Sequence, residues 1–305
     1  MNHPSDAVLL DGGMGQELVR RTRQPLTPLW STTVLRDDPD LVAELHADYI
    51  RAHARVVTLS NYTATPMRLS ACGLAQEFDE LHAAAIALAQ RGVTMAAADH
   101  PVAIAGCLPP LVSSYHAEDV PSEDLCSRDY ARLVQAQQAG VEMFMCETLS
   151  SVLEVTAATR AGRASGKPVW VSMTVDDHDG TRLRSGQTLA SGVEAAIAEG
   201  AQAVLVNCAW PEAVAQGMAV LRDYGIPFGG YANGFTHAAA LKKGDTVAAL
   251  SKREDLTPEV YAQHAMGWID MGARIVGGCC EVGPAHIKHL GQTLLDAGVS
   301  LTHRL

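Results

Sequence analysis

Short runs of apolar and β-branched residues alternate along the chain with longer amphipathic stretches rich in Ala and Leu. The short runs have the length of β-strands, and the longer stretches have the spacing of helices with one buried face. This alternation is typical of a parallel sheet covered by helices. Eight strands are predicted, at residues 7–13, 56–62, 102–108, 143–148, 169–175, 203–209, 228–233 and 274–280.

The stretches between the strands predict about eight helices, and several of them end in Gly, a common C-terminal stop. The clearest helical patterns cover residues 38–54, 123–140, 151–166 and 257–273. Eight strand–helix units favour a single-domain (β/α)8 TIM barrel over an open doubly wound sheet, and no Gly-rich dinucleotide fingerprint follows the first strand. We expect residues 1–305 to form one domain, with the polar stretch 236–254 as a lid or rim excursion.

The net charge, the apolar segments and the cysteine count indicate which kinds of partner and cellular compartment to expect. The chain carries a net charge of -11 over 305 residues, which argues against binding a nucleic acid because phosphate neutralisation needs a basic face. The sequence has no basic, apolar leader and no charge-free segment of membrane-spanning length, so we expect no membrane partner and a cytoplasmic protein. We expect a monomer or a small homo-oligomer. The seven cysteines then favour reduced thiols over a disulfide framework.

Unusual polar residues fall at the ends of several predicted strands. Asp11 ends the first, Glu147 the fourth and Cys208 the sixth, while Cys279 and Cys280 end the eighth. Because the active site of a TIM barrel lies at the C-terminal ends of its strands, these five side chains are expected to meet.

Three thiols from two strand ends suit a soft metal such as zinc, with a fourth position left open for a substrate. Adjacent side chains of a regular strand point to opposite faces, so Cys279 and Cys280 can share a site only if the backbone bends. Gly277 and Gly278 precede them and would permit a sharp turn and a close approach. A vicinal disulfide, or chance adjacency at a tight turn, remains an alternative.

The other cysteines and the histidines have plainer interpretations. Isolated cysteines in apolar runs are usually small buried hydrophobic residues, an interpretation that applies to Cys72, Cys107, Cys126 and Cys146. Most histidines fall on predicted helices, where solvated faces would explain them, as for His46, His53, His82 and His264.

The motifs together resemble a known family. The segments are LLDGGMGQEL, CETLSSVLEV, VWVSMTVDDHDGTRLRSGQTL, VNCAWPE and GGCCEVGPAHI, which span nearly the whole chain. The chain resembles the homocysteine S-methyltransferase family, which includes betaine- and S-methylmethionine-dependent enzymes and the homocysteine module of cobalamin-dependent methionine synthase.

The resemblance implies roles for individual residues. It implies that Cys208, Cys279 and Cys280 hold one zinc ion and that the homocysteine sulfur takes the open position. Asp11 and Glu147 match the carboxylates that receive the homocysteine amino group, and Gly12 and Gly13 match a turn whose N–H groups face its carboxylate. Zinc would supply a deprotonated sulfur at neutral pH, which would attack a methyl group on a cationic sulfur or nitrogen.

Several positions depart from the family pattern without touching the implied zinc and homocysteine residues. They are Gln16, Leu59, Ser60, Asn61, Gln187 and Ala232. These departures concern the contacts of the methyl donor. A cationic donor would favour an aromatic wall, and the candidates are Trp210, Tyr231 and Phe235, each with plain packing as the alternative.

The length of the chain favours S-methylmethionine as donor. The chain stops about one helix after the Cys pair, without the C-terminal extension of betaine-dependent relatives or the folate and cobalamin modules of methionine synthase. S-adenosylmethionine is a secondary donor, and betaine is less favoured. The alternatives are a related zinc methyltransferase with another thiol or selenol acceptor, and a non-catalytic zinc or redox protein in which Cys279 and Cys280 form a reversible disulfide.

Overall fold

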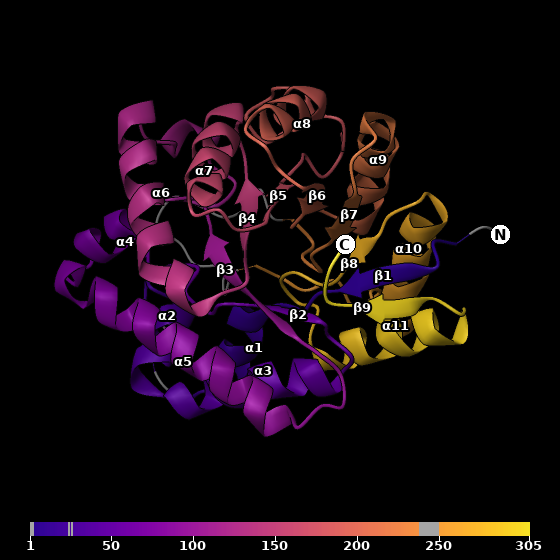
Figure 1. Ribbon diagram of the computed structural model, residues 1–305, viewed down its shortest axis with the longest axis horizontal. Helices are drawn as coiled ribbons and strands as arrows, with labels where there is room; N and C mark the ends of the chain where they lie inside the picture. Colours follow the sequence, from indigo (N-terminus) through magenta and orange to yellow (C-terminus); the bar gives the residue numbers. More distant parts are fainter. Residues whose placement is uncertain (1–2, 24, 26, 238–249) are drawn as a thin grey trace.

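Parallel strands form one curled sheet at the centre of the molecule (Figure 1). The computed structural model describes residues 3–23, 25, 27–237 and 250–305. In this part of the chain nine strands follow the order β2-β3-β4-β5-β6-β7-β8-β1-β9. They are β1 (Asp6–Leu9), β2 (Val56–Thr58), β3 (Ala103–Leu108), β4 (Met143–Leu149), β5 (Val169–Met173), β6 (Ala203–Asn207), β7 (Phe228–Tyr231), β8 (Ile275–Val276) and β9 (Ser300–Thr302).

The sheet closes into a barrel between its first and second strands. Leu10 forms a parallel bridge with Val56, and the Arg55 N–H donates to the Leu9 carbonyl at 2.7 Å. The N-terminal half of β1 pairs instead with β9, a short strand that the sequence pattern did not predict. The eight predicted strands are all present and the predicted TIM barrel is confirmed, with β9 as an addition beside β1.

Helices surround the sheet on its outer face (Figure 1). They are α1 (Met14–Arg21), α2 (Ser31–Asp37), α3 (Pro39–Arg51), α4 (Pro66–Ala71), α5 (Phe78–Ala96), α6 (Glu123–Gln137), α7 (Val152–Ala164), α8 (Leu189–Ala198), α9 (Pro211–Leu221), α10 (Pro258–Asp270) and α11 (Pro284–Asp296). Side-chain caps fix several helix starts: the hydroxyls of Ser151, Thr188 and Thr257 each accept an N–H three residues on. The helices predicted at 38–54, 123–140, 151–166 and 257–273 correspond to α3, α6, α7 and α10.

Strand residues alternate between the barrel interior and the helix layer. Met143 and Met145 of β4 lie in the inner cluster, whereas Phe144 and Cys146 pack in the outer core. Since side chains of a strand have a period of two, the next inward position of β4 is Glu147. The same alternation that builds the core therefore aims this carboxylate into the mouth of the barrel.

Two predictions about exposure are wrong. His46 and His82 are fully buried rather than on solvated helix faces, and burial lowers the pKa of each to about 4. Cys72, predicted to be buried, is exposed, because it follows the last turn of the short helix α4. Cys107, Cys126 and Cys146 are buried as predicted.

The predicted rim excursion at 236–254 lies largely outside the described residues. No helix in the part of the chain that the structure describes is long and apolar enough to cross a membrane.

Candidate metal and substrate site

Three thiols converge at the C-terminal end of the barrel. Cys208 follows β6, and Cys279 and Cys280 follow β8. Their sulfur atoms all lie within 4.8 Å of one another, and the Cys208 and Cys280 Sγ atoms are 3.9 Å apart. Thiolates at the usual zinc–sulfur distance in a tetrahedral site are separated by roughly 3.8 Å. The donor set and its spacing therefore fit a thiolate-bound metal ion.

The backbone bends at the thiols through residues other than the expected glycines. Cys208 and Glu281 have positive φ values of 52° and 66°, a conformation that costs non-Gly residues energy and often marks a functional site. Gly278 does not have a positive φ; it allows a close approach, because a Cβ atom there would lie 2.2 Å from Val282 Cγ1. The close approach expected at the glycines is confirmed, and the left-handed backbone conformation falls at Glu281, directly after the thiols.

The turn after β1 packs directly on the Cys279–Cys280 segment. A Cβ atom on Gly13 would lie 2.5 Å from the Cys279 carbonyl oxygen, which is backbone and cannot swing away. We expect Gly13→Ala to lower the free energy of unfolding by about 1–3 kcal/mol through this overpacking. Urea denaturation followed by circular dichroism measures it.

Gly267 provides the matched control for that substitution. It lies within α10 and has open space where a Cβ would be built. Gly267→Ala is expected to be neutral or to stabilise the protein by up to about 1 kcal/mol through helix propensity. Equal effects of the two substitutions would contradict the packing role of Gly13.

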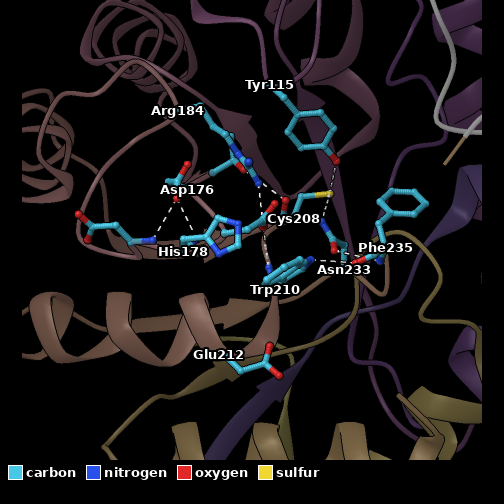
Figure 2. Close-up of polar contacts among 12 residues, drawn as sticks. Tyr115, Asp176, His178, Arg184, Cys208, Trp210, Glu212, Asn233 and Phe235 are labelled. Atoms are coloured by element: carbon cyan, nitrogen blue, oxygen red, sulfur yellow. Dashed lines mark hydrogen bonds and ion pairs between the residues drawn. The ribbon is translucent and has the colours of Figure 1, made fainter. Parts of the chain in front are cut away.

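Two polar side chains contact the Cys208 sulfur, as Figure 2 shows. The Tyr115 hydroxyl lies 2.9 Å from Cys208 Sγ, and Asn233 Nδ2 donates to it at 3.9 Å. Burial by itself raises the pKa of Cys208, but hydrogen bonds from Cys279, Cys280 and Tyr115 outweigh it and hold that pKa well below the usual range. Cys208 is the thiol prepared to ionise first, and a cation would draw the remaining protons from the other two.

Tyr115 is itself held from the other side by Arg184. The guanidinium lies 5.2 Å from the Tyr115 ring centroid, and it forms a buried ion pair with Asp177 at 2.9 Å. Asp177 also accepts the backbone N–H of Trp210 at 3.0 Å, which extends the network to that residue. Neither Tyr115 nor Arg184 was predicted as a site residue: Tyr115 lies outside the quoted motifs, and Arg184 lies within one of them without a chemical signature of its own.

The thiols open into a cavity of about 350 Å³, within the size range of small-molecule sites. Asp11 and Glu147 line it beside the three thiols, so the structure brings the predicted carboxylates and cysteines together. Asp11 Oδ2 accepts the Thr58 N–H at 2.9 Å, and Glu147 Oε1 accepts from the Cys107 thiol at 2.9 Å. Burial raises the pKa of Asp11 and raises that of Glu147 to about 7.

Gly12 and Gly13 follow Asp11, and their N–H groups are expected to face the carboxylate of homocysteine. Gly12 and Gly13 both line the cavity. In this structure the Gly13 N–H donates to the Val282 carbonyl at 2.9 Å, as part of the packing of the β1 turn on the cysteine segment. A role of Gly12 and Gly13 toward a substrate carboxylate stays a prediction.

The aromatic wall of the cavity differs from the predicted one. Trp30, Tyr62, Tyr115 and Tyr231 line the cavity. Of the three predicted candidates, Tyr231 is among the described lining residues and Trp210 and Phe235 are not. The Trp210 indole N–H instead donates to the backbone carbonyl of the buried Phe235 at 2.9 Å. Trp30 and Tyr62 meet edge to face with ring centroids 6.4 Å apart.

Some departures from the family pattern reach the cavity and others do not. Leu59 and Ser60 line it directly. Gln16 acts through Trp30, whose indole N–H donates to Gln16 Oε1 at 3.1 Å. The Gln187 side chain instead accepts the Val152 N–H, and the Ala232 N–H bonds to the Tyr261 hydroxyl, so both are structural.

Two buried polar atoms of cavity-lining residues, Ser60 Oγ and Arg68 Nε, have no hydrogen-bond partner. Buried polar atoms are nearly always paired, so unpaired ones on residues that line a cavity indicate a polar ligand. The fold and the site together define a TIM-barrel protein with a thiol cluster that can hold a metal beside a polar binding cavity.

Comparisons with known proteins agree with this description. Residues 8–294 match the family model described as homocysteine S-methyltransferase. The homocysteine S-methyltransferase of Escherichia coli K12 is 30% identical over 308 residues, covering 93% of this chain and 94% of that protein. A selenocysteine methyltransferase of Astragalus bisulcatus is 25% identical, covering 97% and 94%.

Solved structures give the same result. The metallated form of the homocysteine methyltransferase MmuM from Escherichia coli superposes with a TM-score of 0.80 at 26% identity, covering 94% of this chain and 96% of that one. Its oxidized form has a TM-score of 0.79. The chain belongs to the homocysteine S-methyltransferase family, whose members are methyl-transferring enzymes.

Proposed function

We propose that this protein transfers a methyl group from S-methylmethionine to homocysteine, with zinc held by Cys208, Cys279 and Cys280. The observation that supports it most is the convergence of three thiols, within 4.8 Å of one another, on a cavity that also holds two carboxylates. Three protein ligands leave a metal position open for a substrate sulfur, as in catalytic rather than structural zinc sites.

Asp11 and Glu147 would bind the ammonium group of homocysteine. Both carboxylates line the cavity with the thiols, and an ammonium would offset the burial that raises their pKa values. Gly12, in the turn after β1, would face the amino-acid carboxylate with its backbone.

Zinc, when bound, would supply the homocysteine sulfur in its deprotonated and nucleophilic form at neutral pH. The protein side chains then position the reaction. Tyr115 and Asn233 fix the Cys208 sulfur, and the aromatic rings of Trp30 and Tyr62 offer faces for a cationic sulfonium. Holding both substrates in one cavity would remove much of the entropic cost of a bimolecular reaction.

The test combines metal analysis with turnover. Zinc content is measured together with methionine formation from homocysteine, with S-methylmethionine, S-adenosylmethionine and betaine offered in parallel. We expect about one zinc per chain and the highest kcat/KM with S-methylmethionine. Protein that binds no zinc after fresh reduction would overturn the proposal, and a preference for betaine would correct the donor.

The similarity to one relative suggests selenocysteine as a second candidate for the methyl acceptor. The selenocysteine methyltransferase of Astragalus bisulcatus is similar over almost the whole chain. Competition between homocysteine and selenocysteine for a limiting donor would decide whether the acceptor is a thiol or a selenol.

A further inference from the structure

The side chains that line the cavity carry both negative and positive charge. Among the described lining residues, the acidic side chains are Asp11 and Glu147, which accompany the three thiols. Arg68 is the one basic side chain of that lining. A cavity with thiols and carboxylates on one part of its wall and a cation on another can orient a ligand that carries both signs of charge.

The backbone of Arg68 is fixed by hydrogen bonds, whereas its guanidinium has few hydrogen-bond partners. It lies on α4, where the Thr65 hydroxyl caps the Arg68 N–H at 3.3 Å and also donates to the Leu111 carbonyl at 2.6 Å. The guanidinium makes one long hydrogen bond, from Nη2 to the Pro110 carbonyl at 3.4 Å, and lies 5.6 Å from the Tyr62 ring centroid. Its Nε atom is buried without a partner.

The cation has no counter-ion in the described part of the chain, where no carboxylate forms an ion pair with it. Arg184, whose side chain is buried beside the cavity-lining residue Tyr115, is by contrast paired with Asp177. Burial lowers the pKa of Arg68, which expresses the cost of holding this charge away from water. The residue as a whole is partly buried, with its Nε atom fully buried. An unpaired charge that is largely removed from water is costly unless an anion compensates it, so an anionic ligand group is the natural partner.

Two aromatic side chains connect Arg68 with the thiol cluster. The Tyr62 hydroxyl, beside Arg68, lies 2.8 Å from Ser114 Oγ, and the next residue, Tyr115, contacts Cys208 Sγ. A ligand that extends from the thiols to Arg68 therefore passes along aromatic rings, which suit a sulfonium and its alkyl chain. The cationic sulfonium is repelled by Arg68 and attracted by the anionic thiols, so only one orientation satisfies both ends.

We propose that Arg68 binds the carboxylate of the methyl donor, so that the donor is a zwitterion with a methylated onium group at one end and a carboxylate at the other. This assignment rests on the proposed function and names the substrate class that the donor part of the cavity selects. The planar guanidinium, with its free Nε–H, can hold such a carboxylate through two parallel hydrogen bonds.

The experiment compares two donors in zinc-loaded protein carrying Arg68→Met. One donor is S-methylmethionine, and the other is (3-aminopropyl)dimethylsulfonium, the same molecule without its carboxylate. We expect Arg68→Met to raise KM for S-methylmethionine about 10- to 100-fold while KM for homocysteine stays constant. Wild-type protein and the variant should use the carboxylate-free donor equally poorly.

Arg132→Met is the matched control, since Arg132 also lies over an aromatic ring, that of Phe78 at 4.1 Å, but does not line this cavity. It should leave both donor KM values unchanged. Equal losses with the two donors in Arg68→Met, or an unchanged KM for S-methylmethionine, would overturn the assignment. A selective rise in KM for homocysteine would overturn it too, since Arg68 would then hold the acceptor.

Failure of the proposed function would be recognised separately. If wild-type protein turns over none of the onium donors, calorimetric titration of S-methylmethionine into the zinc- and homocysteine-loaded protein still decides the assignment. Binding that is lost in Arg68→Met supports Arg68 as the carboxylate receptor, whereas absent or Arg68-independent binding refutes it.

Discussion

Cys208→Ala is expected to abolish tight zinc binding and to lower methyl transfer by more than about 100-fold, because loss of a residue that merely supports a ligand already costs 10- to 100-fold. Cys208 is the thiol whose pKa is lowered and the one that Tyr115 and Asn233 contact, so its removal takes away the best-prepared ligand. Metal analysis after dialysis and a methionine assay measure the two losses.

Cys126→Ala separates this loss from a general effect of removing a buried cysteine. Cys126 is buried on α6, and its thiol donates to the Pro121 carbonyl at 3.5 Å, outside the cavity. Its loss should cost about 1–2 kcal/mol of stability and leave both zinc and turnover intact. If Cys208→Ala retained one zinc per chain and full activity, Cys208 would be neither a required zinc ligand nor part of the catalytic machinery.

The strand–helix alternation predicted the barrel well because each strand is covered on both faces and reads as a continuous apolar run. The positions of Asp11, Glu147 and the cysteines followed from the barrel alone, since all strands of a parallel barrel end at one rim. β9 escaped prediction because Ser300–Thr302 is short and partly exposed, and only its pairing with β1 defines it.

The donor part of the cavity was harder to predict because loops that are distant in sequence create it. Trp30 lies before α2 and Arg68 on α4, and neither is part of a recognisable motif. Of the aromatic residues that looked suitable, Trp210 donates its indole N–H to the Phe235 backbone carbonyl, and neither residue is among those that line the described cavity. Side-chain direction in loops depends on tertiary contacts, which a periodic pattern does not contain.

Glu147→Gln is expected to weaken homocysteine binding and, at the same time, to stabilise the ligand-free fold at neutral and alkaline pH. The substitution keeps the shape of the side chain but removes the charge that would bind the substrate ammonium, so KM for homocysteine should rise about 10- to 100-fold. Steady-state kinetics at pH 8 measure this loss. Glu44→Gln, on an exposed position of α3, is the control and should change nothing.

The stability gain follows from the raised pKa of the native carboxyl. Burial raises the pKa of Glu147 to about 7 from an ordinary value near 4.5, so the folded protein binds this proton more tightly than the unfolded chain does. The contribution of this group to stability therefore falls as the pH rises from about 4.5 to 7 and stays low above that window. The full shift corresponds to about 3 kcal/mol, and water in the cavity reduces it to about 1–3 kcal/mol.

The amide introduced by Glu147→Gln does not ionise, so the free energy of unfolding of the variant should not fall through this group as the pH rises. Urea denaturation of the two proteins, both free of ligand and metal, should give similar stabilities at about pH 4.5 and a more stable variant at about pH 8. A less stable variant at the higher pH, or an unchanged KM for homocysteine, would contradict the role of Glu147. Because homocysteine would supply the missing positive charge, its addition should stabilise the wild-type protein far more than the variant. The same buried charge that weakens the empty barrel would then be the one that selects the substrate.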